Sequence, residues 1–113
     1  MKIIEQITDN ITIVHLNGRL DAHTCGSVEA FIRERIEKGQ NKFVLNMEDV
    51  EFIDSAGLRV VLVIARDLRS KYKGDLHIAI LQPAVNRVFE ISGLKNVLYI
   101  YNDSENAVQG FSN

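Results

Sequence analysis

The chain has 113 residues, of which 46% are hydrophobic and 25% charged, a composition typical of a single globular domain. Thirteen Lys and Arg against fifteen Asp and Glu give a formal net charge of −2, which disfavours a nucleic-acid-binding protein, because such proteins usually carry a basic excess. The sequence has no apolar run of about 18 residues and no apolar signal-peptide core at its start, so we expect a cytoplasmic protein without membrane insertion.

A hairpin and an amphipathic helix are the first predicted elements of the chain. The isoleucine-rich residues 3–7 and the alternating residues 11–16 predict two strands, which the turn signal between them pairs as a hairpin. A helix follows, because apolar side chains recur at i, i+3, i+4 and i+8 from Val28 to Ile36. We expect Gly39 to end this helix.

Strands and helices alternate through the rest of the chain. Residues 43–45 predict a short strand that is buried on both faces, and a loop over residues 47–54 leads into the longest helix, at about residues 56–72. The elements expected after this helix are a strand at residues 76–81, a helix from Pro83 to Gly93, a strand at residues 97–101 and a final short helix after Ser104.

These elements predict an α/β domain over residues 1–113 with the order β-β-α-β-α-β-α-β-α. We expect a mixed four- to five-stranded sheet with about four helices, in which the N-terminal hairpin is antiparallel and the strands linked through helices are parallel. In such sheets the functional loops lie beyond the carboxyl ends of the strands. This rule directs attention to residues 18–24 and 47–55.

Ser55 is the strongest candidate for chemistry, because it stands where a loop gives way to the longest helix. One interpretation is a helix cap, in which the side chain satisfies free backbone N–H groups. The other is a regulated hydroxyl that the small neighbours Ala56 and Gly57 leave accessible, at a helix start that tolerates the charge of a phosphate. Asp54 also has two interpretations. It is a loop residue or alternative helix cap, or it is an interface carboxylate that orients Ser55.

The motif Asp-Ser-Ala-Gly-Leu at residues 54–58 resembles the phosphoacceptor motif of the STAS domain family. This family comprises the anti-sigma-factor antagonists and the cytoplasmic domains of sulfate transporters. Other segments resemble family elements in the matching order, and the resemblance covers about residues 3–110. These segments are residues 18–21, 43–49, 91–94 and 97–101.

The resemblance implies a partner-switching mechanism. In the anti-sigma-factor-antagonist branch, the unphosphorylated domain binds a partner that is both an anti-sigma factor and a serine-protein kinase using ATP, and this binding frees the sigma factor. The kinase then phosphorylates the serine, here Ser55, which ends binding. A PP2C-like serine phosphatase resets the cycle.

The expected partner interface surrounds Ser55. Capping alone would explain Asp21 or Thr24 at a helix start, whereas the resemblance makes their loop part of the partner surface. Arg59 lies one helical turn beyond Ser55, so a solvated position and an interface position both remain open. The expected interface residues are Asp21, His23, Thr24, Asp54, Ala56, Gly57 and Arg59.

Other functions fit the sequence less well. The runner-up is a STAS subunit of another partner-switching or lipid-transport complex; a chain that begins at Met1 without a membrane region argues against a full transporter. A receiver domain would need an acidic pair after its first strand, which this chain lacks. A hydrolase would need a histidine base for Ser55, yet His15 and His77 fall within strands, His23 alone lies near the right end, and there is no Gly-x-Ser-x-Gly elbow.

No pattern in the chain predicts a metal or a cofactor. The sequence has no His-x-x-x-His or Cys-x-x-Cys spacing and no Gly-x-x-x-x-Gly-Lys phosphate loop. Cys25 is the single cysteine, so it cannot form an intrachain disulfide, and we expect a small, partly buried residue. We therefore expect a protein-binding module without catalytic residues or cofactors.

Overall fold

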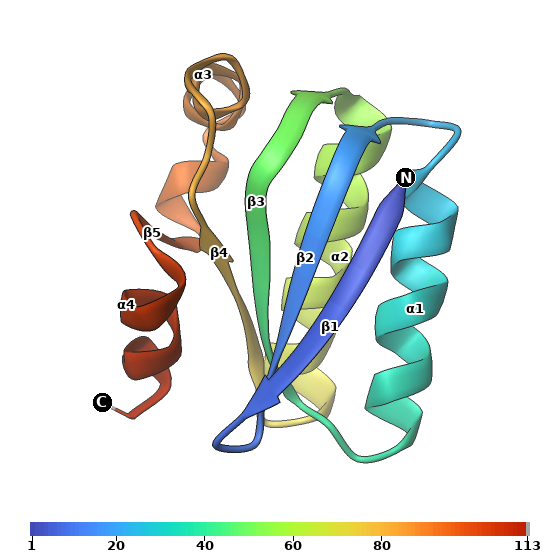
Figure 1. The fold of residues 1–113 in the computed structure, drawn as a ribbon, viewed down its shortest axis with the longest axis vertical. Helices are drawn as coiled ribbons and strands as arrows, with labels where there is room; N and C mark the ends of the chain where they lie inside the picture. The colour runs from blue at the N-terminus through green and yellow to red at the C-terminus, as the bar shows by residue number, and fades with distance from the viewer. Residues whose placement is uncertain (113) are drawn as a thin grey trace.

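A five-stranded sheet with the spatial order β1-β2-β3-β4-β5 forms the centre of the computed structural model (Figure 1). The structure describes residues 1–112; residue 113, the last of the expected domain, lies outside the described residues. β1 pairs antiparallel with β2, and all further neighbours are parallel, which confirms the predicted mixed α/β fold. The strands are β1 (Lys2–Thr8), β2 (Ile11–Leu20), β3 (Lys42–Ile53), β4 (Asp75–Ala79) and β5 (Tyr99–Tyr101).

The predicted hairpin turn lies at Asp9 and Asn10. Both residues take a positive φ, of 50° and 67°. Positive φ at both central residues is the requirement of a two-residue turn that matches the twist of its strands, and Asp and Asn tolerate it better than most side chains. The turn pairs Thr8 with Ile11 and thereby sets the register of the hairpin.

Helices cover the two faces of the sheet unequally. α1 and α2 lie together on one side of the sheet, whereas α4 lies beside β4 and β5 (Figure 1). Among the described residues, no helix combines the length and the apolar character that crossing a bilayer requires. The helices are α1 (Cys25–Glu37), α2 (Ser55–Lys71), α3 (Pro83–Ser92) and α4 (Ser104–Gln109), with short 3-10 turns η1 (Leu94–Asn96) and η2 (Gly110–Ser112).

The main core lies between the sheet and the helices α1, α2 and α3. Its largest fully buried side chains include Phe43 on β3 and Phe89 on α3, which are both 0% exposed. Residues 43–45 are all fully buried, as expected for a strand covered on both faces. A smaller cluster on the opposite face joins Ile11, Val44 and Ala79 to Ala107 of α4.

β3 is much longer than predicted, because most of the expected loop at residues 47–54 is strand. Met47, Val50 and Ile53 are buried at a spacing of three rather than two. Two register shifts in the pairing of β2 with β3 re-aim these side chains toward the core, and a simple alternation pattern does not detect them. The last strand begins at Tyr99 rather than at residue 97, because the backbone N–H groups of Val97 and Leu98 donate to the Leu94 carbonyl in a turn that follows η1.

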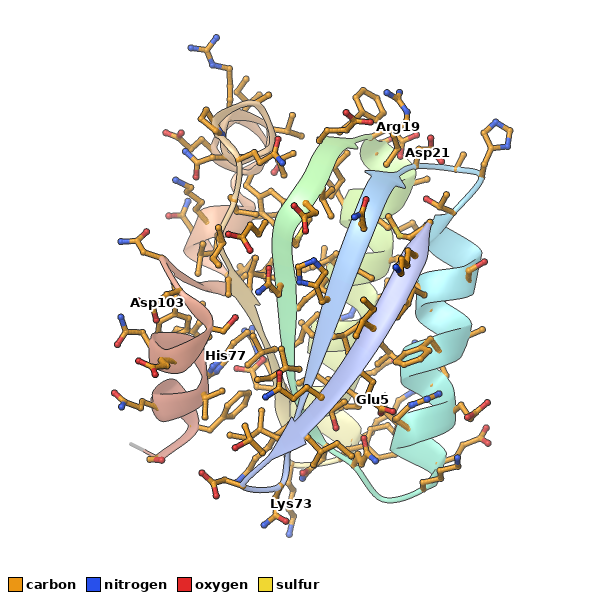
Figure 2. All side chains as sticks on the ribbon, viewed as in Figure 1. Glu5, Arg19, Asp21, Lys73, His77 and Asp103 are labelled. Atoms are coloured by element: carbon orange, nitrogen blue, oxygen red, sulfur yellow. The ribbon has the colours of Figure 1, made fainter. Side chains whose placement is uncertain are left out.

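His77 is buried beside the smaller cluster, next to α4 (Figure 2). Its side chain stacks on Phe111 with ring centroids 3.7 Å apart, and its Nδ1 lies 2.9 Å from the carbonyl oxygen of Ala107. Burial lowers the pKa of His77, although the Ala107 carbonyl and the nearby Asp75 act in the opposite direction. The neutral imidazole therefore donates from Nδ1 to Ala107.

We predict that the protein loses stability as the pH falls from about 7.5 to 5.5. The unfolded chain has the higher histidine pKa at this position, near 6.5, so it takes up the proton first and unfolding is favoured on acidification. His77→Phe keeps an aromatic ring in the stack and removes the titrating group. In urea unfolding at both pH values, the wild type should lose more free energy of unfolding than His77→Phe; equal losses would contradict this account.

Candidate functional site

The candidate site lies where β2 and β3 end side by side. Leu20 at the end of β2 pairs with Ile53 at the end of β3, and the backbone N–H of Asp54 donates to the Leu20 carbonyl at 3.3 Å. This pairing brings the loop at residues 21–24 against the first turn of α2, and both strand ends lie together at the top of Figure 1. The two segments that the sequence indicated, residues 18–24 and 47–55, therefore meet in space, although their first parts belong to β2 and β3 rather than to loops.

Asp54 caps α2 and also binds the neighbouring loop. Its Oδ1 accepts a hydrogen bond from the Gly57 N–H at 3.0 Å, which is the usual N-cap contact. Its Oδ2 accepts from the Ala22 N–H at 3.2 Å. One carboxylate thus joins the start of α2 to the loop that follows β2.

Ser55 is the first residue of α2 and does not cap it. Its side chain is exposed, and its hydroxyl makes no hydrogen bond to any of residues 1–112. The capping interpretation of Ser55 is therefore wrong, because Asp54 already occupies that position. The hydroxyl lies at the surface without a hydrogen bond to the described residues, beside a helix start that Asp54 caps through the Gly57 N–H.

Gly57 allows α2 to approach the end of β2 closely. It is buried, and a Cβ at this position would collide with the Leu20 carbonyl oxygen and lie 2.9 Å from the Ile53 Cγ1. Gly57 therefore sets the position of Ser55 by packing, and it presents no side chain to a partner. Ala56, which is partly exposed, remains at the surface.

The loop at residues 21–24 is held by its own hydrogen bonds. Asp21 Oδ1 accepts from the backbone N–H groups of His23 and Thr24, at 2.9 Å and 3.2 Å. Desolvation opposes ionisation of Asp21, but these donors outweigh it and lower its pKa. Thr24 Oγ1 donates to the Arg19 carbonyl at 2.6 Å, and the His23 side chain is exposed.

Phe52 and Arg19 belong to the same surface, although the sequence did not single them out. The Arg19 Cζ lies 4.0 Å from the centroid of the Phe52 ring, which is 37% exposed. Arg19 Nε also lies 3.6 Å from Asp21 Oδ2 (Figure 2). An exposed aromatic ring under a guanidinium is a typical feature of protein interfaces, and its position two residues before Asp54 was the available signal.

A groove of about 580 Å³ runs between α1 and α2 beside Ser55. Cys25 lines it and is partly buried, as expected. The groove has both polar and apolar walls, so it can accept mixed side chains. Its lining residues are Cys25, Glu29, Ser55, Ala56, Arg59, Val60 and Val63.

No histidine of the described residues contacts the Ser55 hydroxyl as a base would. His15 pairs with Asp49 at 2.7 Å on the sheet, His77 is buried under α4, and the His23 side chain is exposed. Within residues 1–112, none of them hydrogen-bonds to the Ser55 hydroxyl, and no group of three or more His, Cys, Asp or Glu side chains is placed to hold a metal ion. The site therefore consists of an exposed hydroxyl, a groove and fixed loops.

Comparison with known proteins gives consistent matches along the chain. The family model described as the STAS domain matches residues 2–107. The chain is 35% identical to a Bordetella bronchiseptica protein described as an anti-sigma factor antagonist, BtrV, over 98% of this chain and 95% of that protein. These matches agree with the resemblance that the motif at residues 54–58 indicated.

Solved structures with the same fold agree with the sequence matches. A Thermotoga maritima protein described as an anti-sigma factor antagonist is 25% identical, with a TM-score of 0.92 over 98% of this chain and 95% of that one. The Bacillus protein SpoIIAA is 26% identical and has been solved unphosphorylated (TM-score 0.82, over 98% and 96% of the chains) and phosphorylated (0.75, over 97% and 99%).

We predict that Asp54→Ala destabilises the protein by about 1–2 kcal/mol, whereas Ser55→Ala changes stability by less than about 0.5 kcal/mol. The first variant loses the cap of α2 and the bond to Ala22, and the second loses an exposed hydroxyl without a partner. Urea unfolding of both variants measures the difference. A Ser55→Ala cost as large as that of Asp54→Ala would show that Ser55 is the cap.

Proposed function

The chain belongs to the STAS domain family, and from this membership we propose that it is an anti-sigma factor antagonist switched by phosphorylation of Ser55. The unphosphorylated form binds an anti-sigma factor that is also a serine-protein kinase using ATP, and this binding releases the sigma factor. Phosphorylation ends binding, and a PP2C-like serine phosphatase restores the unphosphorylated form.

One structural observation carries this proposal: the Ser55 hydroxyl is exposed and has no hydrogen-bond partner within residues 1–112. A kinase can therefore reach the Oγ without breaking a hydrogen bond within residues 1–112. In the transfer, a bond forms between Oγ and the γ-phosphorus of ATP, the bond from that phosphorus to the bridging oxygen breaks, ADP leaves, and the hydroxyl proton is released. The relatives described as anti-sigma factor antagonists, and the phosphorylated form of SpoIIAA, support the same assignment.

The fold is suited to carry a phosphate without rearrangement. Ser55 is the first residue of a helix of 17 residues, where the free N–H groups and the helix dipole favour an anion. The side chain points away from the core, so the added group needs no cavity. Phosphorylation therefore changes the surface and leaves the scaffold in place.

Charge is sufficient to make this change a switch. A phosphate adds about −1.5 to −2 charges at neutral pH. Two unit charges about 4 Å apart near a protein surface interact by about 4 kcal/mol at an effective dielectric constant of 20, and each 1.4 kcal/mol changes affinity about tenfold. A phosphate held against an acidic partner group would therefore weaken binding by about 100-fold or more.

The proposed interface combines exposed and partly exposed residues of the loop after β2 with the start of α2. It consists of the loop held by Asp21, the capping carboxylate of Asp54 and the first two turns of α2. Arg19 extends it, because its Nε lies 3.6 Å from Asp21 Oδ2, and Phe52 extends it further, because its ring lies under the Arg19 guanidinium. The residues proposed to meet the partner are Asp21, His23, Thr24, Asp54, Ala56 and Arg59, with Gly57 placing Ser55 from below.

We predict that the partner kinase modifies Ser55 alone. Incubation with the kinase and ATP, followed by mass-spectrometric mapping, should place the phosphate on the peptide that contains Ser55, and Ser55→Ala should take up none. Ser70, another exposed serine of α2, is the internal control, because its hydroxyl donates to the Arg66 carbonyl at 2.9 Å. Modification at other serines with none at Ser55 would contradict the proposal.

We also predict that Ser55→Ala retains partner binding and that Ser55→Asp weakens it, by about tenfold or more for the single charge. Calorimetry against the partner measures both affinities. Ser70→Asp supplies the matched control, since it adds the same charge near the other end of α2. All three variants should show the wild-type circular dichroism spectrum, and equal affinities for Ser55→Ala and Ser55→Asp would exclude an electrostatic switch.

A further inference from the structure

Arg59 shares the groove between α1 and α2 with Ser55. The two residues are four apart on α2, so their side chains leave the same face of the helix, with Cβ atoms about 5–6 Å apart. Arg59 is exposed, and within residues 1–112 its guanidinium forms no ion pair. An exposed guanidinium at this spacing can contact a group attached to the Ser55 Oγ.

The acidic side chains near the groove are already engaged. Glu29, on the α1 wall, pairs with Arg33 at 3.3 Å, and Arg33 also binds Asp67 at 2.8 Å. Both carboxylate oxygens of Asp54 accept backbone N–H bonds. Arg59 is therefore the groove side chain that carries a positive charge and is available to bind an added anion.

We propose that Arg59 binds the phosphate of phosphorylated Ser55 within the same chain. The guanidinium is a planar fork whose N–H groups can donate to two phosphate oxygens together. Phosphorylation then has two effects on the interface: it adds an anion at Ser55, and it withdraws a cation that would otherwise face the partner. This inference rests on the proposed function, because it requires Ser55 to be modified.

The arrangement has a consequence for the ionisation of the phosphate. A nearby cation favours the dianion, and so lowers the second pKa of the phosphoserine from its ordinary value of about 6. The groups that face the phosphate are Arg59 and Asp54 on the α2 side and Glu29 and Cys25 on the α1 side. Arg59 is the one cation among these groove residues, so its removal should raise that pKa.

Phosphorus NMR on the full-length chain tests this inference. Phosphoserine is placed at position 55 by genetic encoding, so the outcome does not depend on whether any kinase modifies Ser55. The second pKa of the phosphate should be lower in the wild type than in Arg59→Ala by about half a unit or more. Arg66→Ala, which removes another exposed arginine of α2 that has no ion pair within residues 1–112, should leave the value unchanged.

A second measurement requires no variant. In nitrogen-15 spectra of arginine side chains, the Nε signal of Arg59 should move when position 55 carries phosphoserine instead of serine, and the signal of Arg66 should stay. The same phosphate pKa in the wild type and in Arg59→Ala, or an unchanged Arg59 signal, would overturn the inference. Neither result would bear on whether a kinase uses Ser55, which the mapping of the phosphorylation site decides separately.

Discussion

The candidate site depends on one carboxylate, that of Asp54. Its Oδ1 caps α2 through the Gly57 N–H, and its Oδ2 holds the Ala22 N–H of the adjacent loop. Because the Asp54 side chain caps α2, the Ser55 hydroxyl is not needed as the N-cap acceptor. The adjacent residues therefore have different roles. Asp54 holds the helix start and the neighbouring loop, and Ser55 presents an exposed hydroxyl, which we propose is the phosphorylated group.

The rest of the fold positions this pair with little freedom. Parallel pairing brings the ends of β2 and β3 to one edge of the sheet, and Leu20 meets Ile53 there. Gly57 lets α2 close against the Leu20 carbonyl, which no larger residue would allow. The site thus rests on buried backbone contacts, and on this ground we propose that a charged group added at the surface requires no compensating movement in the core.

The sequence predicted the fold and the two segments that meet at the candidate site, but not which of Asp54 and Ser55 caps α2. Periodicity, proline and capping residues predicted the four α-helices, and the pair Asp9 and Asn10 predicted the hairpin turn, because each carries a local signal; the short 3-10 turns η1 and η2 were not predicted. Periodicity missed the length of β3, since the two register shifts break the alternation on which strand prediction depends. It also could not decide whether Asp54 or Ser55 caps α2, because both residue types cap helices. The contact of Arg19 with Phe52 could not be predicted either, because these residues are 33 positions apart and only the folded sheet brings them together.

The central claim is that phosphorylation changes the surface around Ser55 while the scaffold stays the same. Backbone amide NMR spectra of the chain with serine and with phosphoserine at position 55 test it most directly. The account predicts shifts confined to residues 21–25 and 52–60, with the signals of β4, β5 and α4 unchanged. Changes that spread through those elements would contradict it, because they would show that the switch acts by rearranging the fold.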